Sequence, residues 1–169
     1  MGVATHLNME KTMNFLEQLV AEWYSYKGYF VQTNVKFGPL KRGGYEGEMD
    51  VVAFHPKEKV LVHVETSTDS LSWEKRRSRF ESKFGRAQKY YSELFHFDYG
   101  TVEKIAIVGL RSTAPDGVSF GKDAVIKTGP EFIREITEHL KGKSPLKQAV
   151  PEHWPLIRVL QISAFYRGK

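Results

Sequence analysis

Three acidic residues lie at the ends of the two most strand-like segments of the sequence. Glu48 and Asp50 stand at the head of the apolar run "EMDVVAF", and Glu65 stands near the end of the next run, "KVLVHVETS". Side chains two residues apart on a strand share a face, so Glu48 points with Asp50. By the same rule His63 and Ser67 point with Glu65. Neighbouring strands can therefore bring Asp50 and Glu65 together.

Two carboxylates that converge in a partly buried site repel each other. The usual remedies are a raised pKa, a basic partner or a divalent cation. Oxygen ligands of this kind favour Mg²⁺ or Mn²⁺ over zinc. The alternative is that these acids are solvent-exposed at strand ends, or paired with surface lysines such as Lys57 and Lys59. The absence of cysteine excludes disulfides, thiolate metal sites and cysteine nucleophiles.

The spacing of apolar residues predicts an α/β protein in which a mixed sheet is covered by helices. The predicted elements are a helix over about 10–27, strands over 29–37, 48–54 and 59–67, a helix over about 72–95, strands over 102–110 and 123–128, and a helix over 129–143. The two strands around "HPKEK" are expected to form an antiparallel hairpin. The helix over 72–95 is expected to be a crossover between strands. The final segment, 153–169, is ambiguous between helix and strand.

The length of 169 residues suits one domain, 1–169, with a core over about 10–140 and a C-terminal extension over about 141–169. No apolar run approaches the roughly 20 residues that a membrane span needs. The N-terminal stretch also lacks the apolar region of a secretory signal. We therefore expect a cytoplasmic protein with no membrane partner.

Positive charge is concentrated in one segment. The net charge is +5, and residues 72–91 hold seven Lys and Arg against two Glu. Such a face is either simply solvated or binds a polyanion, of which nucleic acid is the commonest. Arg76, Arg79 and Lys83 are spaced to share one helical face. The predicted phosphate-binding residues are Arg76, Arg77, Arg79, Lys83, Arg86 and Lys89.

The order of these motifs resembles the PD-(D/E)XK nuclease superfamily, especially its Mrr-type and archaeal Holliday-junction-resolvase-like branches. The resemblance covers about residues 15–110 and implies a restriction-endonuclease-like αβββαβ core. "FLEQLVAEWYSYKGYFV" is similar to the family's opening helix and places Glu17 at its glutamate. "GEMDVVAF" places Asp50 at the metal-binding aspartate, and "VLVHVETS" places Glu65 at the acidic position of the signature. More loosely, Gln88 and Tyr91 are similar to a glutamine and tyrosine on the helix that follows.

One position departs from the family pattern. Ser67 stands two residues after Glu65, where the family has its lysine. A serine hydroxyl is neutral and cannot offset the charge of a phosphate as that lysine is thought to do. Some members carry the lysine on another element, and Lys36, Lys75 and Lys83 are the candidates here.

The resemblance implies a nuclease that hydrolyses phosphodiester bonds in nucleic acid, DNA rather than RNA. Asp50 and Glu65 would bind Mg²⁺ or Mn²⁺ with Glu17 assisting, and Ser67 completes the predicted catalytic set. The alternative is a nuclease-fold module that binds nucleic acid or a protein partner without cleaving. Many members pair subunits, and the sequence leaves a homodimer open. His63 is either a metal ligand or base, or a packing residue with one hydrogen bond.

Overall fold

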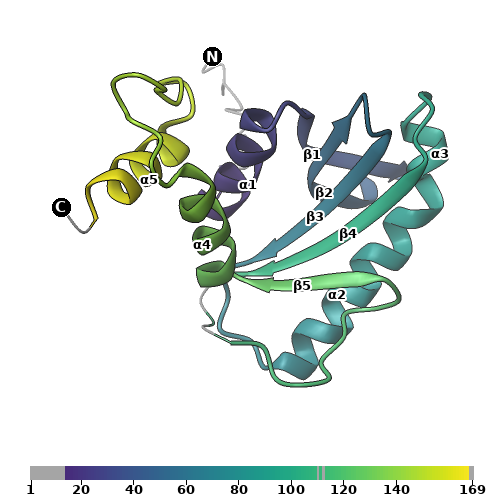
Figure 1. Cartoon of the computed structure of the whole chain (residues 1–169). Coiled ribbons are helices and arrows are strands. Elements are labelled where there is room, and N and C mark those ends of the chain that lie inside the picture. Colours follow the sequence, from purple (N-terminus) through teal and green to yellow (C-terminus); the bar gives the residue numbers. More distant parts are fainter. Residues whose placement is uncertain (1–13, 110, 112, 168–169) are drawn as a thin grey trace, which may run out of the picture.

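A five-stranded sheet with helices on both sides organises the chain (Figure 1). The computed structural model describes residues 14–109, 111 and 113–167. The elements are α1 (Phe15–Tyr26), β1 (Phe30–Pro39), β2 (Tyr45–His55), β3 (Val60–Ser67), α2 (Trp73–Ala87), the 3₁₀ turn η1 (Gln88–Tyr90), α3 (Tyr91–Leu94), β4 (Thr101–Val108), β5 (Ala124–Thr128), α4 (Gly129–Leu140) and α5 (Pro155–Tyr166). This confirms the predicted order of elements within the described part of the chain.

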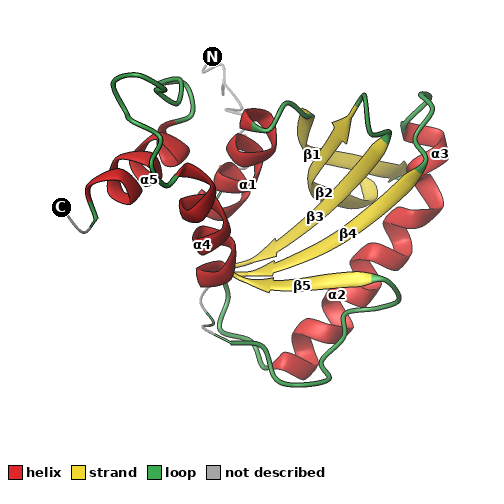
Figure 2. Ribbon diagram, viewed as in Figure 1, coloured by secondary structure: helices red, strands yellow, loops and turns green. Residues whose placement is uncertain are grey.

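The sheet is mixed, with strand order β1-β2-β3-β4-β5. The pairs β1–β2 and β2–β3 are antiparallel, and the pairs β3–β4 and β4–β5 are parallel. The predicted hairpin is therefore formed by β2 and β3. Parallel neighbours need a crossover connection, and α2 lies in the one between β3 and β4 (Figure 2). The predicted α/β class, a mixed sheet flanked by helices, is confirmed.

Each face of the sheet has its own core. On one face Val51, Ala53, Val62 and Val64 pack with buried residues of α1, α4 and α5. On the other face α2 and α3 supply Phe80, Phe84, Ala87 and Tyr91, which pack against the sheet. The segment predicted as one helix over about 72–95 therefore buries its aromatic residues against the sheet, although it is interrupted by η1 before α3 begins.

Both ends of α1 are defined by local chemistry. The side chain of Asn14 caps the helix by accepting hydrogen bonds from the backbone N–H groups of Leu16 and Glu17 at 2.9 and 3.0 Å. Gly28 follows the helix with φ +89°, a conformation that glycine adopts without strain. The predicted end of this helix is confirmed, and residues 10–13 of its predicted start lie outside the described residues.

β1 packs on different cores before and after Asn34, which adopts φ +54°. Val31 packs with the core that α1 covers, whereas Val35 and Phe37 pack with the core that includes Ala87 and Tyr91. The ring of Phe37 lies over Gly47 of β2, where any Cβ would collide with it. Asparagine is among the few non-glycine residues that tolerate this backbone region. Phe37 also lies in the wall of the cavity described below.

The ambiguous C-terminal segment is a helix, α5, and a carboxylate of α1 anchors it. Oε2 of Glu22 accepts hydrogen bonds from the backbone N–H groups of Leu156 and Ile157 at 2.8 and 3.0 Å. Oε1 of the same residue accepts a bond from Gln18 at 2.8 Å. Glu22 thus occupies the role of an N-cap, which the preceding residue, Trp154, does not fill with its own side chain.

Replacing Glu22 by alanine is expected to lower the free energy of unfolding by about 1–3 kcal/mol, because it removes a charged acceptor from two buried N–H groups. Urea denaturation of Glu22→Ala measures the change. Glu138→Ala is the matched control, since Glu138 is exposed and only faces Lys141 at 3.5 Å. A loss no larger in Glu22→Ala than in the control would contradict the anchoring role.

Candidate active site

The register of the β2–β3 hairpin brings Asp50 and Glu65 face to face. Val51 pairs with Val64 in the antiparallel ladder, so the next residues outward, Asp50 and Glu65, lie opposite each other. Both are buried, with exposed fractions of 4% and 0%. The lysines of the alternative interpretation are elsewhere, and Lys59 is bonded to Asp98. The two acids form one buried pair, as the strand pattern predicts.

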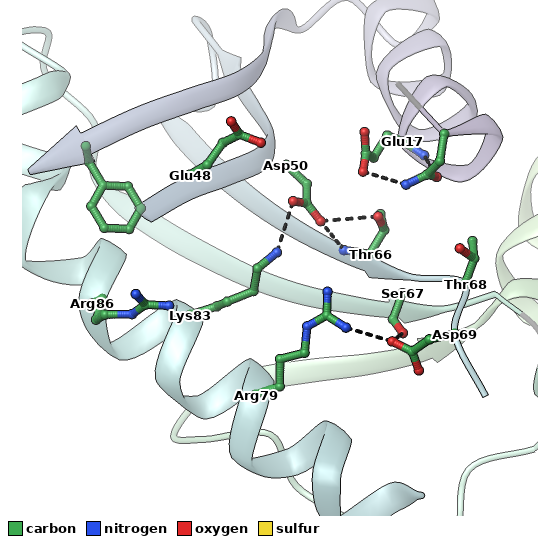
Figure 3. Close-up of a pocket in the computed structure, with 12 residues that line it drawn as sticks. Glu17, Glu48, Asp50, Thr66, Ser67, Thr68, Asp69, Arg79, Lys83 and Arg86 are labelled. Carbon is green, nitrogen blue, oxygen red and sulfur yellow. Dashed lines mark hydrogen bonds and ion pairs between the residues drawn. The ribbon is translucent and has the colours of Figure 1, made fainter. Parts of the chain in front are cut away.

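A lysine from α2 joins the two acids. The ammonium of Lys83 donates to Oδ1 of Asp50 at 3.0 Å and to Oε2 of Glu65 (Figure 3 shows the first contact). Lys83 is three residues after Phe80 and directly before Phe84, so it lies at the edge of the side of α2 that faces the sheet. The other two candidates do not take this position, because Lys36 lies over the ring of Tyr45 and Lys75 is exposed.

Asp50 and Lys83 keep each other ionised. Burial alone would raise the pKa of Asp50, but the charge of Lys83 and the backbone N–H of Thr66 outweigh burial and hold that pKa below its ordinary value. Burial would likewise lower the pKa of Lys83, yet the charges of Glu65 and Asp50 raise it above its ordinary value. The Asp50 carboxylate and the Lys83 ammonium are therefore both charged at neutral pH.

The second oxygen of Asp50 is also held. Oδ2 accepts hydrogen bonds from the backbone N–H of Thr66 at 2.8 Å and from its hydroxyl at 3.2 Å. The aspartate is therefore fixed from both sides, by β3 and by α2. Sequence analysis did not single out Thr66, and only its place beside Glu65 in a strand facing Asp50 could have indicated it.

Ser67, at the end of β3, contacts an acid that the sequence analysis missed. The hydroxyl of Ser67 donates to Oδ2 of Asp69 at 2.7 Å, and Arg79 donates to the same oxygen at 2.7 Å. Burial raises the pKa of Asp69, but the bonds from Ser67 and Leu71 and the charges of Arg76 and Arg79 bring it below its ordinary value. Asp69 could have been found from its position just past β3, because the last residues of that strand, Glu65 to Ser67, belong to the site.

Glu17 reaches the site from the first turn of α1. It is buried, and the amide of Asn14 donates to its Oε1. Glu17 lines the same cavity as Asp50 (Figure 3). The capping of α1 by Asn14 therefore also orients this glutamate toward the cavity.

A cavity of about 370 Å³ opens over these residues. Its acidic lining comes from α1, from β2 and from the loop after β3, and its basic lining comes from α2. The lining residues are Asn14, Glu17, Phe37, Glu48, Asp50, Thr66, Ser67, Thr68, Asp69, Arg79, Lys83 and Arg86. Glu65 is not among them, because it lies behind the ammonium of Lys83.

The acids of the site offer oxygen donors of the kind that a divalent ion prefers. Asp50 and Glu65 already share one cation, the Lys83 ammonium, and their hard oxygen atoms suit Mg²⁺ or Mn²⁺. Within residues 14–109, 111 and 113–167, no three His, Asp or Glu side chains are grouped closely enough to surround an ion as they stand. Ligation by both acids requires the Lys83 ammonium to move aside.

The basic residues of α2 and η1 lie in two places. Arg79 and Arg86 of α2 line the cavity, whereas Arg77 of α2 and Lys89 of η1 are exposed outside it. Arg86 also donates to the backbone carbonyl of Glu46 at 2.7 Å. These four predicted phosphate-binding residues, like Lys83 in the cavity wall, lie where a ligand can reach them.

Arg76 corrects the predicted set of phosphate-binding residues. Its side chain is fully buried, and it donates to the backbone carbonyls of Leu71 and Asp69 and to the Asp69 carboxylate at 3.2 Å. Its guanidinium holds the turn between β3 and α2 and cannot reach a phosphate. The spacing that placed it beside Arg79 and Lys83 could not distinguish the buried side of that face from its exposed side.

The fold and site define an α/β protein with a buried, lysine-bridged pair of carboxylates beside a cavity. Comparison of the chain with protein-family models, with curated proteins and with solved structures found no match. In the described part of the chain, none of the helices has the length and apolar character needed to cross a bilayer.

Replacing Lys83 by methionine is expected to lower the free energy of unfolding by about 3–5 kcal/mol near neutral pH, because it leaves two buried anions without their cation. In the wild type, the lowered pKa of Asp50 contributes stability above pH 3.8 that is lost as the pH falls through the folded-state pKa. The raised pKa of Lys83 contributes stability below pH 10.5 that is lost as the pH rises through its folded-state pKa.

In Lys83→Met the buried Asp50 carboxyl loses its cation, so its pKa rises, and the folded variant binds a proton and regains stability on acidification. The difference from wild type should therefore shrink between about pH 7 and about pH 4.5. Urea denaturation in EDTA at both pH values measures it, with Lys141→Met as the exposed control. An equal difference at both pH values would contradict the charge coupling.

Proposed function

We propose that this protein is a metal-dependent nuclease that hydrolyses phosphodiester bonds in DNA. The observation that carries the proposal is the ion pairing of Lys83 with both Asp50 and Glu65. In the family that the chain resembles, a lysine stands two residues after the second acid on the same strand, and this chain has Ser67 at that position. Lys83 supplies the corresponding positive charge from α2 instead.

The arrangement of elements supports a restriction-endonuclease-like αβββαβ core. An acid-bearing helix precedes three antiparallel strands, and a crossover helix then leads to a parallel strand. Glu17, Asp50 and Glu65 come from the three elements that the resemblance assigns to them. The acid pair and the cavity lie at the end of β3 from which the chain passes into the crossover.

The site residues have separate roles in the proposed reaction. Asp50 and Glu65 would hold Mg²⁺ or Mn²⁺, with Glu17 assisting from α1. The ion, when bound, supplies Lewis-acid stabilisation of the charge that develops on the phosphoryl oxygens. Lys83 would offset part of the same charge, and Arg79 would place the neighbouring phosphate. Ser67 contributes by fixing Asp69, which holds Arg79 at the cavity wall.

A second candidate function is a module that binds nucleic acid or a protein partner without cleaving it. It is favoured by the position of Glu65, which is fully buried behind Lys83 and does not line the cavity. If the ammonium never leaves the two acids, an ion cannot be shared between them. The basic residues of α2 would still bind phosphates in that case.

The purified protein is expected to cleave linear duplex, single-stranded or branched DNA in Mg²⁺ or Mn²⁺, and to stop when EDTA is added. Asp50→Ala and Lys83→Met should each lower kcat by about 100-fold or more, because each removes a charge that acts on the transition state. Gel analysis of end-labelled substrates measures the rates, with Lys141→Met as the control for loss of a lysine.

The outcomes separate the two candidate functions. Intact substrates in every assay, with wild type and Asp50→Ala indistinguishable, would contradict a nuclease. DNA binding by that uncleaving wild type would favour the second candidate.

DNA binding should depend steeply on salt, since cations of α2 displace counterions from the phosphates. In an Asp50→Ala background, replacing both Arg77 and Lys89 by alanine should reduce the slope of log affinity against log salt by about 2. Replacement of Arg134 in α4 and of Lys141 directly after it, on the opposite face of the sheet, by alanine is the two-charge control. Equal slopes in the two double variants would contradict binding along α2.

A further inference from the structure

A buried chain of hydrogen bonds ends on the proposed metal-binding glutamate. Oε1 of Glu65 lies 2.7 Å from Nε2 of His63, and Nδ1 of His63 lies 2.7 Å from the hydroxyl oxygen of Tyr91. His63 and Glu65 are fully buried, and Tyr91 is 5% exposed. The sequence analysis weighed His63 as a metal ligand or base, or as a packing residue with one hydrogen bond. The structure gives it two hydrogen bonds and no access to the cavity.

Glu65 and Tyr91, at the two ends of this series of hydrogen bonds, determine which atoms donate. A carboxylate oxygen only accepts hydrogen bonds, so Nε2 of His63 must carry the proton that it donates to Glu65. Burial first, and then the charges of Glu65 and Tyr99, raise the pKa of Tyr91, so its hydroxyl keeps its proton. That hydroxyl finds its acceptor in Nδ1 of His63. All three polar groups are satisfied when Nε2 of His63 donates to Glu65 and Nδ1 accepts from Tyr91.

The imidazole ring is also held by its neighbours. Phe84 of α2 meets it edge to face, with centroids 5.0 Å apart, and the ring of Tyr91 does so at 5.8 Å. These contacts come from two elements that lie over the sheet, while His63 itself is on β3. The ring is therefore fixed in direction, and the N–H bond that it presents to Glu65 is fixed with it.

We propose that His63 is a positioning residue, which holds one oxygen of Glu65 so that the other faces Lys83, and that Tyr91 selects the tautomer that does so. The catalytic consequence rests on the nuclease function proposed above. Each oxygen of Glu65 then has one assigned partner: Oε1 accepts from His63 and Oε2 from Lys83. In the other tautomer, the lone pair of Nε2 would face the carboxylate and repel it.

Kinetics of three variants test the positioning role. His63→Leu removes the donor and is expected to lower kcat by about 10- to 100-fold with little change in KM, because DNA does not touch His63. His63→Gln places an amide N–H near the position of Nε2 and should retain activity within a few-fold of wild type. Tyr91→Phe should fall between them. His55→Leu is the control, since His55 contacts Glu58 and Tyr29 instead of the site.

A second measurement does not need activity. Long-range ¹H–¹⁵N spectra of the imidazole in the 169-residue chain should show that the neutral ring carries its proton on Nε2 and not on Nδ1, and Tyr91→Phe should lose this tautomer preference. If the wild type does not cleave DNA but shows this tautomer, the nuclease proposal fails and the positioning of Glu65 stands. A neutral ring protonated at Nδ1, or His63→Leu with the kcat of wild type, would overturn the inference.

Discussion

One ammonium buried between two carboxylates is the interaction on which the rest of this structure depends. Asp50 and Glu65 face each other inside the protein, where an unneutralised pair of charges would be strongly destabilising. Lys83 removes that penalty only if α2 lies directly over the hairpin. The aromatic stripe of α2 holds the helix there, and the turn secured by Arg76 sets where the helix begins.

The same helix connects the buried cluster to the surface. One side of α2 carries the rings that pack on the sheet, and Lys83 lies at the edge of that side. Arg79 and Arg86 follow around the helix and border the cavity, and Arg77 and Lys89 face solvent. A polyanion bound along the exposed side would therefore be led toward the acids. One side of α2 thus packs on the sheet, and the other side is the one proposed to bind a polyanion.

Local patterns in the sequence predicted much of this site, and tertiary packing determined the remainder. Strand alternation predicted that Asp50 and Glu65 would meet, because register follows from a short hairpin. No local pattern could choose Lys83 from three candidate lysines, since the choice depends on how α2 lies over the sheet. The same limit explains the burial of Arg76, which helical spacing alone placed among the phosphate-binding residues. Within the ambiguous C-terminal segment, α5 (Pro155–Tyr166) forms partly through Glu22, which lies more than a hundred residues earlier.

A crystal structure of the protein soaked in Mn²⁺, with anomalous data collected at the manganese edge, tests the central claim most directly. The account predicts a manganese peak in contact with both Asp50 and Glu65, with the Lys83 ammonium displaced from between them but still in the cavity. Carboxylates that remain bonded to Lys83 alone at saturating Mn²⁺ would contradict it.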